Sequence, residues 1–225
     1  MISVVVPASG SGTRFGEKLP KQFCQVAGQD LLWHTLHKFQ QMDCIDEIVP
    51  VIPPGYTQRV AGYPFAKIST IVAGGESRGH SIYNGLQGVN PACRIVLIHD
   101  GARPLVQAQD VENLIAAVKK HHAAILATPV TDTIKAVLQH EGNMTITQTV
   151  DRANLWQAQT PQGFTYQLIL DAYQQNIKDG TLHLQTDDSS LIENTGHPVH
   201  IVSGSPGNIK ITTKADMSYL EKEFI

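Results

Sequence analysis

The chain has 225 residues, of which 42% are hydrophobic and 16% charged, as is ordinary for a water-soluble globular protein. Its formal net charge of −3 excludes a strongly basic surface, so we expect no nucleic-acid partner. No stretch approaches the roughly 18 apolar residues of a membrane span, and the first residues lack the charged start of a signal peptide. We therefore expect no membrane partner and a cytoplasmic location. The scattered cysteines Cys24, Cys44 and Cys93 argue against a disulfide framework or a zinc site.

Short apolar runs rich in β-branched residues alternate along the chain with stretches of helical period. The predicted strands are Ile2–Val6, Glu47–Ile52, Thr70–Val72, Ile95–Ile98 and Ala124–Thr128. The predicted helices are Leu31–Met42, Arg78–Gly88 and Val111–His121, with Asp30 and Asp110 as N-caps. This alternation predicts one α/β domain over residues 1–225, with a Rossmann-like, mostly parallel sheet and helices on both faces. Ligands of such sheets bind beyond the carboxyl ends of the strands.

Residues of about 133–155 interrupt this alternation. Two extended runs flank Glu141, Gly142 and Asn143, a pattern typical of a β-hairpin rather than of another βα unit. An isolated two-stranded hairpin is marginally stable in water, so we expect this protruding arm to lie against a partner surface. A second subunit is the obvious partner, and a hairpin folded onto its own domain is the alternative.

The first predicted strand leads into a glycine-rich loop. Backbone N–H groups of such a turn can surround a phosphate. The loop does not match the dinucleotide-binding fingerprint, because Phe15 stands where the third glycine is required. It does not match the P-loop pattern either, because Leu19 follows Lys18 where Ser or Thr is required. Two cations, Arg14 and Lys21, accompany the loop, and cations beside a phosphate site suit phosphoryl or nucleotidyl transfer. The whole segment reads Pro7-Ala8-Ser9-Gly10-Ser11-Gly12-Thr13-Arg14-Phe15-Gly16, then Leu19-Pro20-Lys21-Gln22.

Two further segments carry candidate ligand-binding groups. The turn Gly74-Gly75-Glu76-Ser77-Arg78 opens a helix, and its backbone together with Ser81 could hold the edge of a base. Asp100 follows the fourth strand, where a carboxylate is a natural oxygen ligand for Mg²⁺, although a turn cap is the alternative. We interpret His99 as structural, because magnesium prefers oxygen ligands to imidazole.

The last candidates flank the arm and the C-terminus. Arg152 with the hydroxyls of Thr133 and Thr160 would suit a phosphomonoester, since a guanidinium matches two phosphate oxygens. Lys135 lies in the same region, where a solvated surface charge is the simpler interpretation. Residues 208–212 are predicted as a short strand with Lys210 facing inward.

Six ordered blocks of the chain resemble the sugar-phosphate nucleotidyltransferases, and most closely the 2-C-methyl-D-erythritol 4-phosphate cytidylyltransferase family of non-mevalonate isoprenoid biosynthesis. The blocks are the glycine-rich segment and residues 73–82, 98–104, 129–135, 149–162 and 208–212. The resemblance implies transfer of CMP from CTP to 2-C-methyl-D-erythritol 4-phosphate, with Mg²⁺ or another divalent cation. It also implies a homodimer in which the arm reaches into the neighbouring subunit, so that Arg152 and Thr160 serve the partner's active site.

The resemblance further assigns roles to individual residues of this chain. It implies catalytic roles for Arg14, Lys21 and Lys210, and a tentative metal-ligand role for Asp100. It implies acceptor-substrate binding by Asp100, Arg103, Thr133, Arg152 and Thr160, with Arg103 mainly supporting its loop. It implies CTP binding, with the base read by main-chain groups, at Pro7, Ala8, Ser9, Gly10, Gly12, Gly75, Glu76, Arg78, Ser81, Asp100 and Gly101.

Two departures from the family pattern affect these expectations. Ser9 stands where many relatives carry alanine, which a main-chain contact tolerates. Gly207 stands where some relatives carry an acidic residue, so it stays open whether a second protein carboxylate binds the metal. Asp187 and Asp188 are alternatives for that ligand, although we interpret them as the start of a helix through Glu193. Two other functions also stay open, a ribitol-5-phosphate cytidylyltransferase and a non-catalytic nucleotide-binding protein.

Overall fold

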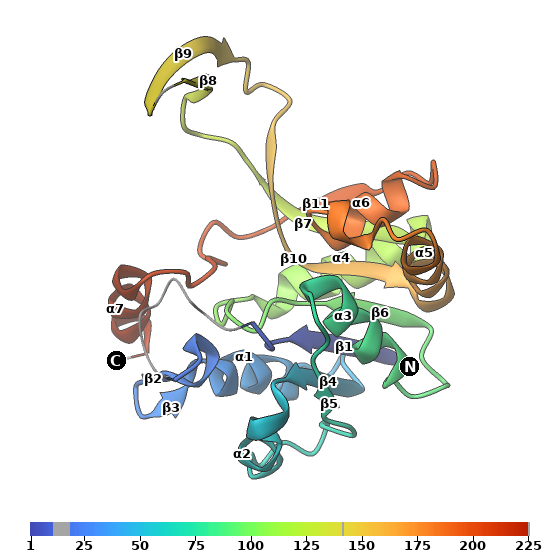
Figure 1. The fold of residues 1–225 in the computed structure, drawn as a ribbon. Helices are drawn as coiled ribbons and strands as arrows, with labels where there is room; N and C mark the ends of the chain where they lie inside the picture. The colour runs from blue at the N-terminus through green and yellow to red at the C-terminus, as the bar shows by residue number, and fades with distance from the viewer. Residues whose placement is uncertain (11–18, 141, 225) are drawn as a thin grey trace.

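The computed structural model describes residues 1–10, 19–140 and 142–224. Its centre is a seven-stranded sheet with the strand order β11-β7-β10-β6-β1-β4-β5 (Figure 1). Strands β6, β1, β4 and β5 run parallel to one another, as do β7 and β11, whereas β10 lies antiparallel between β6 and β7. The predicted mostly parallel sheet is therefore confirmed. The strands are β1 (Ile2–Pro7), β4 (Glu47–Ile52), β5 (Val72–Ala73), β6 (Ile95–Ile98), β7 (Ala123–Pro129), β10 (Trp156–Thr165) and β11 (His200–Ser203).

Helices cover both faces of this sheet, as predicted. Successive side chains of a strand point to opposite faces. Val4 and Val6 of β1 accordingly join a buried cluster with α1 and α4, while Val5 joins another with α3, α5 and α6. None of the described helices has the length and apolarity needed to cross a membrane. The helices are α1 (Leu31–Gln40), α2 (Thr57–Ala61), α3 (Arg78–Gln87), α4 (Ala108–His121), α5 (Tyr166–Lys178), α6 (Asp188–Glu193) and α7 (Lys214–Glu223), with short 3-10 turns at Lys21–Phe23, Pro54–Tyr56 and Leu182–Leu184.

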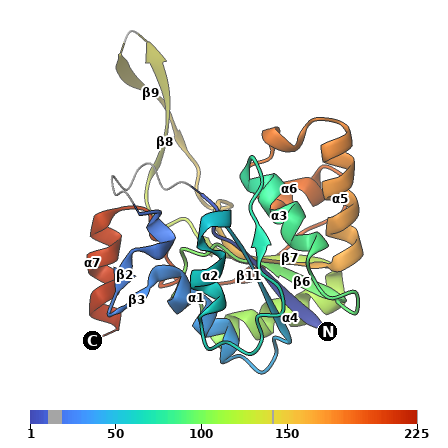
Figure 2. The ribbon, with the colours of Figure 1, turned by 60° about the horizontal axis from the view of Figure 1, so that its bottom comes forward.

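A smaller core lies beside the main sheet and joins the two ends of the chain. Strands β2 (Gln25–Val26) and β3 (Gln29–Asp30) form a short antiparallel pair next to helix α7 (Figure 2). Val26 and Leu31 bury their side chains there against Ile211 and Leu220. The C-terminal segment is thereby held close to the residues that follow the glycine-rich loop.

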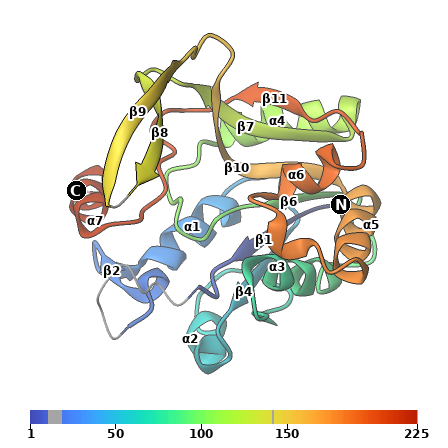
Figure 3. The same cartoon turned by 45° about the horizontal axis from the view of Figure 1, so that its top comes forward.

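The predicted arm is a separate two-stranded sheet (Figure 3), and it projects from the body of the molecule (Figure 1). It consists of β8 (Ile134–His140) and β9 (Asn143–Val150), paired antiparallel. Gly142 has a positive φ of 82°, a conformation that glycine adopts without steric cost. The arm exposes large apolar side chains, including Leu138, Met144 and Ile146 at 61%, 74% and 60%.

Several local predictions need correction. Helix α4 begins at Ala108 with Gln107 as its N-cap, so Asp110 is not the cap; its carboxylate accepts a hydrogen bond from the Ser205 N–H instead. Asp30 does occupy the N-cap position of α1, but its carboxylate binds Arg59 and Tyr63 rather than the helix backbone. Residues 208–212 form no strand, and only Val72 of the predicted Thr70–Val72 lies in one.

Candidate active site

A cleft of about 520 Å³ opens at the carboxyl ends of β1 and β6, the edge where an α/β sheet binds its ligands. Predicted CTP-binding residues from three separate segments of the chain surround it. Gly12 and Arg14 lie outside the described residues, so the structure does not place them. The cleft is lined by Pro7, Ala8, Ser9, Gly10, Lys21, Gln22, Gly75, Glu76, Ser77, Arg78, Ser81, Asp100, Gly101, Ala102 and Lys210.

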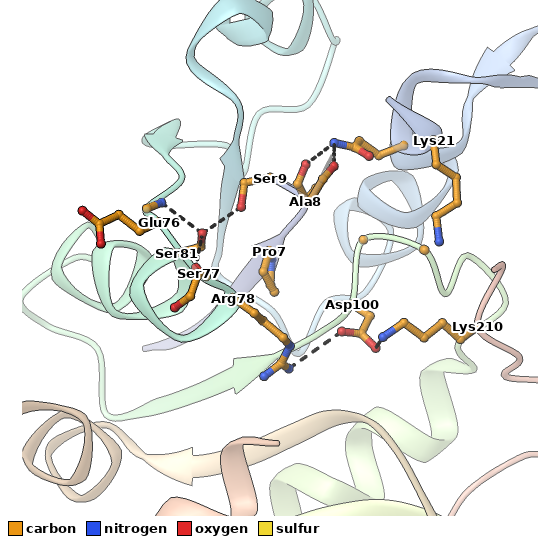
Figure 4. A pocket seen from close by; sticks show the side chains of 15 residues that line it. Pro7, Ala8, Ser9, Lys21, Glu76, Ser77, Arg78, Ser81, Asp100 and Lys210 are labelled. Carbon is orange, nitrogen blue, oxygen red and sulfur yellow. Dashed lines mark hydrogen bonds and ion pairs between the residues drawn. The ribbon is translucent and has the colours of Figure 1, made fainter. Parts of the chain in front are cut away.

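Asp100 lies at the tip of β6 among three cations, of which Figure 4 shows Arg78 and Lys210. Its carboxylate is 2.9 Å from Lys210 Nζ, 3.5 Å from Arg103 Nε and 3.8 Å from Arg78 Nη2. Burial by itself would raise the pKa of Asp100, but the charges of Lys210 and Arg78 outweigh it and lower that pKa to about 2. The carboxylate is therefore ionised at neutral pH.

Arg78 also holds a second carboxylate, which belongs to Asp188 of α6. Its guanidinium donates to both oxygens of Asp188 at 3.1 and 2.8 Å, and the Tyr173 hydroxyl donates to the same group at 2.6 Å. Burial lowers the pKa of Arg78, but the negative charge of Asp188 more than reverses this, so the guanidinium stays charged. Asp187 caps α6 through Ser190 N–H, which confirms the interpretation of this pair as a helix start.

A buried chain of hydrogen bonds supports the backbone of Asp100 from below. The Asp100 N–H donates to Thr160 Oγ1 at 3.0 Å, and Thr160 Oγ1 lies 3.3 Å from His99 Nδ1. His99 Nε2 lies 3.0 Å from the carbonyl of Arg103. Burial lowers the pKa of His99 to about 4, so the ring is neutral, with its proton on Nε2 where an acceptor faces it. His99 is structural, as predicted, and Thr160 is 5% exposed with its hydroxyl used inside the protein.

Lys210 reaches the cleft from an irregular segment held at both ends. On one side the buried Asn208 donates to the carbonyl of Thr160 at 2.8 Å, and Arg103 Nη1 donates to the carbonyl of Asn208 at 2.7 Å. On the other side Ile211 N–H donates to the carbonyl of Ala102 at 2.8 Å, and Lys21 Nζ donates to the carbonyl of Ile211. Lys21 and Lys210 are thus brought together from opposite ends of the sequence.

The remaining acceptor-site candidates do not gather in one place within a single chain. A second cavity of about 810 Å³ lies at the base of the arm and includes Arg103, Thr131 and Lys210. Thr133 and Arg152 are exposed and do not line it, and Arg152 donates to the Thr131 carbonyl. Lys135 donates to Thr149 on the exposed arm. A phosphate site formed by Thr133, Arg152 and Thr160 stays a prediction.

Comparison with known proteins decides the family. The model of the 2-C-methyl-D-erythritol 4-phosphate cytidylyltransferase family matches residues 2–225. The chain belongs to this family. It is similar to the proteins of that name from Alkaliphilus oremlandii (45% identity, covering 98% of this chain and 93% of that one) and Clostridioides difficile (41% identity, covering 99% and 93%).

Solved structures of the same family share the fold. A crystal structure of 2-C-methyl-D-erythritol 4-phosphate cytidylyltransferase from Francisella tularensis matches with a TM-score of 0.84 at 30% identity and covers 99% of both chains. The enzyme of the same name from Thermus thermophilus matches with a TM-score of 0.79 at 31% identity, covering 98% of this chain and 97% of that one. The chain is therefore a nucleotidyltransferase of the cytidylyltransferase class.

Gln22 and Ser77 line the cleft of this cytidylyltransferase but were not predicted as site residues. Gln22, only 5% exposed, donates its amide to the carbonyls of Ala8 and Gly10 at 2.6 and 3.1 Å, which orients the start of the glycine-rich loop. The sequence offered one indication that Gln22 belongs to the site, namely its position directly after Lys21 in the glycine-rich segment. Ser77 caps α3 by accepting from His80 N–H.

The carboxylates of the described residues suit a divalent cation only in part. No group of three or more His, Cys, Asp or Glu side chains in the described ranges could hold a metal ion. Asp100 is ionised and lines the cleft, whereas Asp188 is committed to Arg78 and Tyr173. One carboxylate fits a Mg²⁺ that keeps its waters and is bound mostly by substrate phosphates.

Proposed function

We propose that this chain transfers CMP from CTP to 2-C-methyl-D-erythritol 4-phosphate, giving CDP-methylerythritol and pyrophosphate in non-mevalonate isoprenoid biosynthesis. The observation that carries the proposal is the division of the cleft into an end with hydroxyl and backbone groups and an end with two lysines. Ser9, Gly75 and Ser81 form one end, and Lys21 and Lys210 stand at the other (Figure 4). A pyrimidine nucleotide would lie with its base at the first end and its triphosphate at the second.

The reaction needs no protein nucleophile. An oxygen of the methylerythritol phosphate forms a bond to the α-phosphorus of CTP, while the bond from that phosphorus to the oxygen bridging to the β-phosphate breaks. Because the attacking phosphate is already an anion, no base has to remove a proton. Lys21, Lys210 and Arg14 would stabilise the negative charge that builds on the α-phosphate and on the leaving pyrophosphate, and most of the rate would come from this and from orientation.

Asp100 and Arg103 would serve at the junction of the two cavities. Asp100 would provide the protein's oxygen ligand to a divalent cation or accept from a substrate hydroxyl. The cation, when bound to the phosphates, supplies further charge neutralisation. Arg103 and Lys210 line the second cavity, which supports an acceptor site there.

The arm would complete the acceptor site in a cytoplasmic homodimer. Thr133 and Arg152 are exposed at the base of the arm, where a partner's active site could receive them. The apolar side chains of β8 and β9 support a partner surface of this kind, because an exposed apolar patch is costly in a monomer. Thr160, buried beneath Asp100, would position this aspartate within its own subunit.

The test of the reaction is pyrophosphate release with Mg²⁺, comparing the four nucleoside triphosphates and two acceptors, methylerythritol phosphate and ribitol 5-phosphate. Release with CTP and methylerythritol phosphate alone is expected. Faster release with ribitol 5-phosphate would instead favour the ribitol-5-phosphate cytidylyltransferase alternative, and no release with any pair would favour a non-catalytic nucleotide-binding protein.

The catalytic role of Lys21 has its own test. Lys21→Ala should lower kcat by on the order of a hundredfold or more, as expected for the loss of one charge-stabilising donor. Lys119→Ala, an exposed position in α4, is the matched control and should leave kcat unchanged. Near-normal turnover of Lys21→Ala would remove this lysine from the mechanism.

A further inference from the structure

The cleft residue Arg78 is held from behind by Asp188, a fully buried carboxylate that lines neither cavity. Arg78 Nη1 and Nη2 donate to the two oxygens of Asp188 at 3.1 and 2.8 Å. A pairing through two parallel bonds fixes the orientation of the guanidinium as well as its distance. The Tyr173 hydroxyl donates to the same carboxylate at 2.6 Å, so Asp188 is itself held on a second side.

The start of α6, which carries Asp188, is tied to the central sheet. Gln162 of β10 donates to Asp187 Oδ2 at 2.8 Å and accepts from the Ser189 N–H at 2.8 Å. These two bonds lie immediately before and after Asp188 in the chain. Asp188 is therefore a fixed point against which the side chain of Arg78 is set.

The same guanidinium approaches the carboxylate of Asp100 at a distance longer than a hydrogen bond (Figure 4). Arg78 Nη2 lies 3.8 Å from Asp100 Oδ1, whereas Lys210 Nζ and Arg103 Nε lie 2.9 and 3.5 Å from Oδ2. Arg78 thus contributes its charge to Asp100 without occupying the lone pairs of Oδ1. A two-bond pair between Arg78 and Asp100 would occupy them.

One guanidinium therefore stands between two carboxylates, and its pairing with one limits its pairing with the other. An amide in place of Asp188 would carry no negative charge and would turn an N–H donor towards one Arg78 nitrogen. In the part of the chain that the structure describes, Asp100 would then be the carboxylate left within 4 Å of Arg78.

We propose that Asp188 is a positioning residue for the transfer reaction, because it holds Arg78 back from Asp100 and so keeps Asp100 Oδ1 available to the ligand in the cleft. The inference rests on the proposed function, in which Asp100 contacts a substrate hydroxyl or the cation on the phosphates. Asp188 itself touches neither, and it acts through Arg78.

The test is a double-mutant cycle on kcat/KM for CTP, measured by pyrophosphate release. Asp188→Asn should lower kcat/KM roughly tenfold, which lies within the usual coupling between residues in contact. In an Arg78→Gln background the same change should have almost no effect, because no guanidinium remains to close on Asp100. Equal losses in both backgrounds would indicate a purely structural role and overturn the proposal, as would an unchanged kcat/KM in Asp188→Asn.

Two variants control for the loss of stability, which thermal unfolding measures in each case. Tyr173→Phe removes a bond to the same carboxylate but leaves Arg78 paired, so it should destabilise the fold without lowering kcat/KM. Asp30→Asn removes another buried carboxylate that accepts from an arginine and a tyrosine, Arg59 and Tyr63, and its effect should be the same with and without Arg78. A loss of kcat/KM in the first control as large as in the tested variant would overturn the proposal.

If Asp188→Asn alone does not fold, the comparison of Arg78→Gln with the double variant still decides. Equal kcat/KM is expected, and a lower value in the double variant would overturn the proposal. Calorimetric titration of CTP with Mg²⁺ and no acceptor separates this inference from the proposed function. A wild-type chain that releases no pyrophosphate, but whose CTP affinity shows the same dependence on background, would refute the reaction and keep the role of Asp188. A chain that turns over CTP with equal losses in both backgrounds would do the reverse.

Discussion

The residue that shapes the site most is Asp100, whose side chain and backbone are fixed by separate sets of contacts. Lys210, Arg103 and Arg78 surround its carboxylate, while Thr160 accepts from its N–H. Its position therefore depends on His99 being neutral, because only the neutral ring can accept from Thr160 at Nδ1 and donate from Nε2.

This dependence predicts acid sensitivity with a defined sign. Burial lowers the pKa of His99 from 6.5 to about 4, so between these values the unfolded chain binds a proton that the folded chain does not. The full stability is present above pH 6.5, falls progressively as the pH drops from 6.5 to 4, and the total loss is at most about 3 kcal/mol. Protonation of Asp100 adds a further loss of folding stability as the pH falls from 3.8 towards about 2.

Urea unfolding at pH 7 and pH 5 measures this effect. His99→Gln should be less stable than the wild type at pH 7 but should lose less stability between the two pH values, because glutamine does not titrate. Comparing the two slopes cancels the contributions of other histidines. Parallel slopes would show that His99 is not the group responsible.

Thr160 provides a second prediction at this scale. Thr160→Val leaves the Asp100 N–H and His99 Nδ1 without partners and should cost about 1–3 kcal/mol of unfolding free energy. It should also lower kcat, because Asp100 loses its support. Thr160→Ser keeps the hydroxyl and should retain most of both, as measured by thermal unfolding and pyrophosphate release. Equal behaviour of the two variants would show that packing, not the hydroxyl, matters at this position.

Short motifs predicted most of the cleft, because each places its residues at a strand tip or in one turn. Contacts between distant segments were not predictable in the same way. Nothing in the sequence indicates that Asn208 holds Thr160, or that the Thr160 hydroxyl supports Asp100 rather than facing solvent. The arrangement arises only when β10 is inserted next to β6.

At the scale of elements, β1, β4, β6, β7 and the arm were predicted, whereas β11 and α5 were not. Strand β10 was missed for a physical reason. Its sequence is rich in glutamine, and strands of polar composition show no buried period. In the structure Gln162 is buried, donates to Asp187 and accepts from Ser189 N–H, so its polar atoms are satisfied internally. Such partners lie about 25 residues further along the chain and leave no local signal.

The C-terminal helix α7 is the element we expect to couple packing to catalysis. Leu220 is fully buried against the cluster that contains Ile211, whose carbonyl accepts from Lys21. Leu220→Ala should cost about 2–5 kcal/mol and lower kcat, because both Lys21 and Lys210 depend on this segment. Leu114→Ala, equally buried in α4, is the control for destabilisation alone and should leave kcat unchanged when both variants are assayed folded. Equal kcat losses would mean that α7 has no special role.

At the scale of the whole molecule, the cleft and the candidate residues at the base of the arm lie apart within one chain. The described residues of the predicted nucleotide site line one cleft of a single chain, whereas Thr133 and Arg152 lie outside both cavities. A dimer joined through β8 and β9 would bring these side chains to the partner. The alternative, an arm serving its own domain, predicts that each chain is self-sufficient.

Mixing two inactive variants separates these alternatives. Arg152→Ala removes the residue that a subunit would give to its partner, and Lys210→Ala removes the residue that it uses itself. In a random 1:1 mixture, half of the dimers contain one chain of each variant. Each of these dimers has one active site in which both Arg152 and Lys210 are intact. About a quarter of all sites are then functional, so about a quarter of the wild-type activity should return. Ile146→Asp in the Arg152→Ala chain should weaken the arm interface and abolish this recovery, while Leu184→Asp, equally exposed but outside the arm, should not. If the mixture stays as inactive as its components, each site uses its own Arg152 and the arm does not complete the partner's active site.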